Sequence, residues 1–167
     1  MDHPVVLFLL RAIHIVGGVF WVGGVVLVTL FVLPAARSVG PSGQQMLMDI
    51  MLRRKLSVYL IVSAILTTIA GFVLYGRNMS LSAGAWGRSP MGIGMTVGAI
   101  CSIIAVIIGM AISAPAAKKM AAAGAPGGTP MSDEERNRLQ GRTAVASRVV
   151  LFLLAVAVLT MATARYY

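Results

Sequence analysis

The chain has 167 residues, of which 58% are hydrophobic and only 11% are charged, and its mean hydropathy is +0.88. These values exclude an ordinary soluble domain and indicate an integral membrane protein. The net charge of +9 comes from basic residues that lie in particular connections between apolar segments, so it indicates membrane topology and contact with anionic lipid and predicts no nucleic-acid partner.

Four apolar segments are each near or above the roughly 20 residues that a helix needs to cross about 30 Å of hydrocarbon. They cover about residues 5–33, 56–75, 91–114 and 145–164. Because they leave too little chain for a soluble domain, we expect one all-α membrane domain, residues 1–167. With modest loops, its four helices should form an antiparallel bundle. The start of the chain lacks the basic region of a signal peptide, so the first segment is expected to be a retained span.

The first segment combines ionisable, aromatic and small residues on one helical face. Arg11, His14, Gly17, Gly18 and Trp21 share that face because they follow one another at close to the helical repeat of about 3.6 residues. Ionisable residues within a bilayer are costly, and each is therefore a candidate functional residue. The long side chain of Arg11 could reach the outer surface, whereas His14 lies one turn deeper.

The first connection predicts a turn at residues 38–43. Residues 44–55 then have the pattern of an interfacial helix that continues into the second segment. Near the centre of that segment lie Thr67 and Thr68, whose hydroxyls are expected to bond to the backbone of their own helix, followed by Gly71.

The third segment has small residues at Gly94, Gly98 and Ser102, a spacing that lets another helix or a flat ligand approach closely. Its single cysteine, Cys101, reads as a packing residue. In the third connection, residues 121–130 predict a flexible loop. Ser132 and Glu135 then form a capping box, so we expect a helix that starts at Ser132 and runs unbroken into the fourth segment.

Ten of the fourteen basic residues lie in the first and third connections. They are Arg37, Arg53, Arg54, Lys55, Lys118, Lys119, Arg136, Arg138, Arg142 and Arg148. The positive-inside rule therefore places these connections in the cytoplasm and both termini on the outer, periplasmic side of the cell (inner) membrane.

A haem b site is the chemistry that the first segment favours. A neutral histidine is a common axial ligand of haem iron, so His14 is the candidate ligand. Arg11 could pair with a haem propionate, Gly17 and Gly18 could make room for the flat macrocycle, and Trp21 could stack on the ring or fill the bundle. A His14 that is simply hydrogen-bonded to another helix is an equally open interpretation.

The second axial ligand stays open. His3 lies too far along the helix to reach the same iron, so the ligand could be a methionine, or His14 of a second copy in a homodimer, or absent. The candidate methionines are Met91, Met95, Met110 and Met161. No acidic residue lies within a predicted span, and no hydrolase motif occurs, which argues against carboxylate-based cation transport and against hydrolysis.

Two stretches resemble the CopD-like group of small membrane proteins. They are R-A-I-H-I-V-G-G-V-F-W-V-G-G in the first segment and L-R-R-K-L-S-V-Y-L-I-V-S-A-I-L-T-T-I-A-G-F-V-L-Y across the second. The group includes the copper-resistance CopD membrane domain and the haem-containing bacterial protoporphyrinogen oxidase. The matching positions are His14, Trp21, Gly23 or Gly24, Arg53, Arg54, Thr67 or Thr68, and Gly71.

The resemblance implies a four-helix membrane protein with haem b ligated by His14. The oxidase has a lysine and often a histidine around its third helix, and residues 91–113 here contain neither, which argues against protoporphyrinogen oxidation. A membrane oxidoreductase that acts in electron transfer or porphyrin-related redox chemistry stays open. Two alternatives are a cofactor-free accessory subunit of a larger membrane complex, and copper handling through methionines and the Asp2-His3 terminus.

Overall fold

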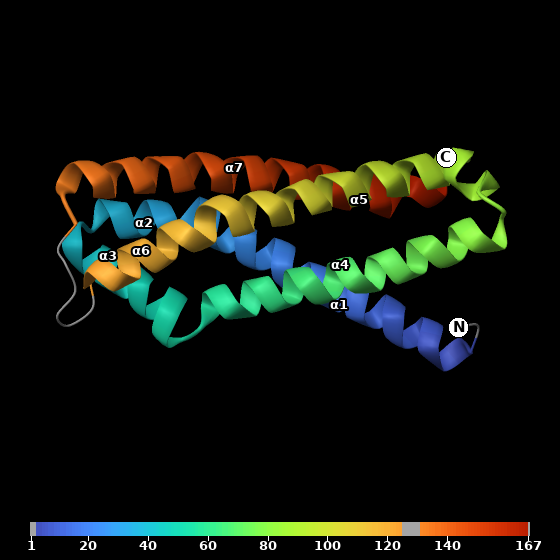
Figure 1. Cartoon of the computed structure of the whole chain (residues 1–167), viewed down its shortest axis with the longest axis horizontal. Coiled ribbons are helices and arrows are strands. Elements are labelled where there is room, and N and C mark those ends of the chain that lie inside the picture. Colours follow the sequence, from blue (N-terminus) through green and yellow to red (C-terminus); the bar gives the residue numbers. More distant parts are fainter. Residues whose placement is uncertain (1–2, 125–130, 167) are drawn as a thin grey trace.

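The computed structural model of the chain describes residues 3–124 and 131–166. All the regular structure in these residues is helical (Figure 1). The helices are α1 (Pro4–Leu27), α2 (Leu33–Ser38), α3 (Pro41–Met48), α4 (Leu56–Leu81), α5 (Pro90–Ile108), α6 (Ala114–Gly124) and α7 (Asp133–Thr163). The all-α prediction is confirmed.

Four stretches of helix are long and apolar enough to cross a membrane. They are Pro4–Ser38, Leu56–Leu81, Pro90–Met120 and Asp133–Tyr166, so each predicted segment lies within a longer helix. Many of the large apolar side chains on these helices are exposed, among them Phe8, Phe31, Phe72 and Phe152. Such a surface needs an apolar solvent, which indicates a multi-pass membrane protein.

Two spans continue through prolines at which the sequence suggested an end. A π-helical turn (Val28–Val32) links α1 to α2 just before Pro34, and another (Gly109–Ser113) links α5 to α6 just before Pro115. Proline lacks an N–H and its ring clashes with the carbonyl four residues earlier in a regular helix. A π turn changes that register, so the helix can pass the proline without a break.

The segment between the first two spans differs from its prediction. Its helix α3 starts at Pro41 and passes into a π turn over Asp49–Arg53, and Lys55 then adopts a left-handed conformation with φ of 58°. This left-handed residue ends the helical path, so the predicted continuation into α4 is wrong.

The third connection follows the sequence at its end and departs from it at its start. Ser132 accepts a hydrogen bond from the Glu135 N–H at 3.2 Å, and α7 then runs unbroken for 31 residues, which confirms the cap and the long helix. The predicted loop at 121–130 is instead helical as far as Gly124, and residues 125–130 lie outside the described part of the chain.

The spans pack as two pairs, α1 with α4 and α5 with α7 (Figure 1). Figure 1 also shows the N-terminus, the C-terminus and the connection between α4 and α5 at one end of the molecule, and α2, α3 and α6 at the other end. The small residues of α5 serve the second pair, since Gly98 lies against Met161 and Thr160 of α7 and Gly94 lies against Ala164.

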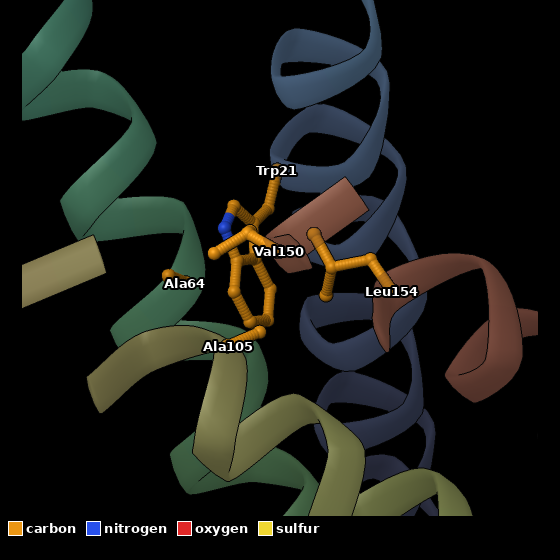
Figure 2. Packing of buried hydrophobic residues seen from close by; sticks show 5 residues of the cluster. All are labelled: Trp21, Ala64, Ala105, Val150 and Leu154. Atoms are coloured by element: carbon orange, nitrogen blue, oxygen red, sulfur yellow. The ribbon is translucent and has the colours of Figure 1, made fainter. Parts of the chain in front are cut away.

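The two pairs meet at Trp21, whose side chain is 6% exposed. Around it lie Ala64 of α4, Ala105 of α5, and Val150 and Leu154 of α7, so every span contributes to this cluster (Figure 2). The small alanines make room for the indole, which fills the space between the helices.

Candidate functional site

His14 projects from α1 toward α4 and is partly buried there. Its Nδ1 atom lies 2.8 Å from the backbone carbonyl oxygen of Thr67. A carbonyl oxygen only accepts, so Nδ1 carries the proton and donates it to this bond. In the neutral imidazole the lone pair is then on Nε2, which is the atom left to act as an acceptor or a metal ligand.

The imidazole lies directly on the backbone of Gly71, one turn further along α4. A Cβ atom at position 71 would come within 2.8 Å of His14 Cε1 and 2.9 Å of His14 Nδ1. These distances are shorter than van der Waals contact, so only glycine lets the ring lie this close to the helix. Thr67 and Gly71 therefore fix both the orientation and the tautomer of His14.

The two threonines of α4 behave differently from each other. Thr68 donates to the Ala64 carbonyl oxygen at 2.7 Å, as expected from the sequence. The prediction fails for Thr67, whose hydroxyl is buried and makes no hydrogen bond in the described part of the chain.

The side chain of Thr67 packs against Gly17 and Gly18 of α1. A Cβ at Gly17 would lie 2.5 Å from Thr67 Oγ1, and one at Gly18 would lie 3.6 Å from Thr67 Cγ2. The space beside both glycines is thus filled by α4. Their observed role is the close approach of two helices, as in other membrane helix pairs with small residues at the crossing.

The other predicted site residues form no hydrogen bond with the imidazole in the described part of the chain. Arg11 is exposed, and no carboxylate of the described residues forms an ion pair with it. Trp21 belongs to the central cluster, so it fills the bundle, as one of its two interpretations predicted. The structure therefore brings His14, Gly17 and Gly18 together with Thr67 and Gly71 of α4.

The candidate second ligands are scattered over two helices. Met161 of α7 packs on Gly98, while Met91, Met95 and Met110 belong to α5 and the π turn that follows it. His3 is exposed before the first turn of α1, and its neighbour Asp2 lies outside the described residues. Among residues 3–124 and 131–166, no three His, Cys, Asp or Glu side chains cluster as a metal site.

Sequence reasoning missed the partner of His14, because that partner is a backbone carbonyl and has no side-chain signature. The threonine and glycine at positions 67 and 71 were the accessible signal, since they are one turn apart on one face of the second span. All four spans also line a cavity of about 230 Å³ on the α3 and α6 side of Trp21, which no sequence pattern indicated.

Comparisons of the chain with protein-family models, with curated proteins and with solved structures find no match in any of the three sets. Function is therefore inferred from the local chemistry of His14 and its neighbours on α1 and α4.

Proposed function

We propose that the chain is a small haem b-binding protein of the cell inner membrane that acts in electron transfer or porphyrin-related redox chemistry. The observation that supports this is the hydrogen bond from His14 Nδ1 to the Thr67 carbonyl oxygen, which leaves Nε2 free. Metal-bound histidines almost always donate their other ring N–H to a carbonyl or carboxylate in this way. The test is the absorption spectrum of the purified protein with and without His14.

The donor chemistry around His14 fits one axial bond to a haem iron. The Thr67 carbonyl holds the imidazole in the required tautomer and raises the basicity of Nε2. The ring also packs against the backbone of Gly71. Arg11, one turn closer to the N-terminus, offers a planar guanidinium for a propionate. Haem bound in this way supplies one-electron redox chemistry.

The chain's own residues restrict where such a group could lie. Gly17 and Gly18 cannot give the room that their sequence suggests, because Thr67 occupies it, and Trp21 is committed to the central cluster. The open lone pair on His14 Nε2 is the remaining point of attachment. The second ligand of the iron would be a methionine or His14 of a second copy. Without either, the iron would stay five-coordinate.

We also propose that the four spans form an antiparallel bundle with both termini on the periplasmic side. Support comes from the ten basic residues of the first and third connections, which belong in the cytoplasm. Arg77, Arg88 and Arg165 are the basic residues left for the second connection and the C-terminal end.

Fusions of a periplasm-specific reporter test this orientation. Alkaline phosphatase fused after Ala83, in the connection between α4 and α5, should be active, because that enzyme folds only where its disulfides form. The same reporter fused after Ala123, at the end of α6, should be inactive and serves as the matched control. An inactive fusion at Ala83 with an active one at Ala123 would reverse the orientation.

A cofactor-free accessory subunit is the second candidate. Gly94 and Gly98 of α5 already pack against residues 160–164, but Gly23 of α1 is exposed and a Cβ there would meet no atom within 4 Å. A partner helix could approach closely at that point. Recovery of the protein only as a free monomer in mild detergent would count against this role.

A further inference from the structure

The cavity between the four spans is large and apolar. Its volume is about 230 Å³, and its wall includes Val25 of α1, Leu60 of α4, Val106 of α5 and Val150 of α7. An apolar cavity of roughly 150 Å³ stays dry and takes up a molecule the size of benzene. This cavity therefore has room for a longer stretch of hydrocarbon and offers little to water.

Both proline-linked π turns open onto this cavity. Val28 and Thr29 belong to the turn that precedes α2, and Gly109, Met110 and Ser113 belong to the turn that precedes α6. π turns are locally wider than α-helix and occur often at functional sites. Two irregular turns, which belong to separate spans, thus form part of the cavity wall.

A second, smaller chamber adjoins the first. It measures about 40 Å³ and shares five wall residues with the large cavity: Leu33, Leu47, Met48, Met120 and Thr143. Its wall also includes the polar residues Arg37, Gln44 and Gln140, and we call it the polar chamber for these residues, although most of its surface is apolar. Thr143 lies at the junction, with a buried hydroxyl that makes no hydrogen bond in the described part of the chain.

The polar chamber has hydrogen-bond donors to spare. Arg37 Nη2 donates to the Gln140 carbonyl oxygen at 3.1 Å, and Gln140 Nε2 donates to Gln44 Oε1 at 3.3 Å. A guanidinium has five N–H donors, so most of those of Arg37 remain available, and their planar fork matches a phosphate. Arg37 is exposed and forms no ion pair with any described carboxylate.

The surrounding end of the molecule carries an excess of positive charge. Asp49 pairs with Arg53 and Arg54, and Glu135 pairs with Lys119. Arg136 also pairs with Asp133. The two connections at this end contain ten basic residues and only four acidic ones. Such an excess attracts anionic headgroups at a membrane surface.

We propose that the two adjoining chambers bind one anionic membrane phospholipid, with an acyl chain in the apolar cavity and its phosphate at Arg37. The apolar chamber would take the acyl chain, and Arg37 with the basic residues of the two connections would take the negatively charged phosphate. The site does not depend on haem, since none of its wall residues belongs to the surroundings of His14.

Native mass spectrometry of the full chain in mild detergent tests the site. The protein is titrated with phosphatidylglycerol and with phosphatidylcholine of identical acyl chains. We expect phosphatidylglycerol to bind about tenfold more tightly, because its phosphate charge is uncompensated, whereas the choline of phosphatidylcholine places a positive charge beside Arg37 and the other basic residues of this end. Equal binding of the two lipids by the wild-type protein would overturn the proposal.

The polar chamber is tested by Arg37→Gln, with Arg138→Gln as the control. Arg138 is an exposed basic residue of α7 that lines neither chamber. Arg37→Gln should remove most of the preference for phosphatidylglycerol, and Arg138→Gln should leave it unchanged. A similar loss in both variants would indicate attraction to the general positive charge and would contradict a phosphate site at Arg37.

The apolar chamber is tested by Gly109→Leu, with Gly23→Leu as the control. At both glycines a Cβ would meet no atom within 4 Å, but only Gly109 lines the cavity. Gly109→Leu should weaken binding of phosphatidylglycerol about tenfold, because its side chain takes the place of part of the acyl chain. Unchanged binding in Gly109→Leu, or displacement of the lipid by inorganic phosphate alone, would contradict the chain-binding chamber.

Discussion

His14→Ala is expected to abolish haem binding. His14 is the only histidine in the sequence of the four spans, and its replacement removes the proposed iron ligand. Loss of a residue that merely supports a metal ligand typically costs about 10-fold to 100-fold in affinity, so loss of the ligand itself should cost more than about 100-fold. The measurement is a titration of the purified variant with haem, followed at the Soret band.

His3→Ala is the matched control for this experiment. His3 is exposed before α1 and lies more than two turns of helix away from His14, so its replacement should leave the Soret band unchanged. A His14→Ala protein that retains the wild-type band would refute ligation by His14. A band lost in both variants would point to a ligand set that includes the N-terminus.

Gly71→Ala is expected to displace the imidazole of His14. The new methyl group would lie 2.8 Å from Cε1 and 2.9 Å from Nδ1, so the ring must move and its bond to the Thr67 carbonyl must lengthen or break. Overpacking of this kind costs about 1–3 kcal/mol, and loss of the carbonyl partner should lower haem affinity about 10-fold to 100-fold. Thermal unfolding in detergent and the haem titration measure the two effects separately.

Gly76→Ala on the same helix provides the control, because a Cβ at Gly76 would meet no atom within 4 Å. It should leave the haem affinity at the wild-type value and should not lower the melting temperature, because alanine favours a helix more than glycine does where there is room for its methyl group. If Gly71→Ala destabilises the protein and leaves its haem spectrum intact, the packing of His14 stands and its role as the ligand does not. If neither property changes, the close contact between the ring and Gly71 is refuted.

The spans were predictable because a helix that crosses lipid must be apolar along its whole length, whatever its neighbours are. The cap at Ser132 was also predictable, since it depends on residues only three positions apart. The passage of helices through Pro34 and Pro115 was not. It depends on π turns, which the sequence does not mark, and the break at Lys55 depends on a single left-handed residue.

The surroundings of His14 were predictable only in part. Spacing alone placed His14 on a face with Gly17 and Gly18, and one of its two interpretations was a hydrogen bond to another helix, which the structure contains. Which helix provides that bond, and that Thr67 fills the space beside the glycines, depends on how α1 crosses α4. The two chambers likewise arise from residues that are distant in sequence, so no local pattern reveals them.

The most direct test of a haem bound through His14 is the absorption spectrum of the wild-type protein, purified in mild detergent from cells supplied with a haem precursor. We expect a Soret band in the oxidised protein that shifts on chemical reduction and yields the pyridine derivative of haem b. A colourless protein that also fails to acquire a Soret band on addition of haem would contradict the proposed function.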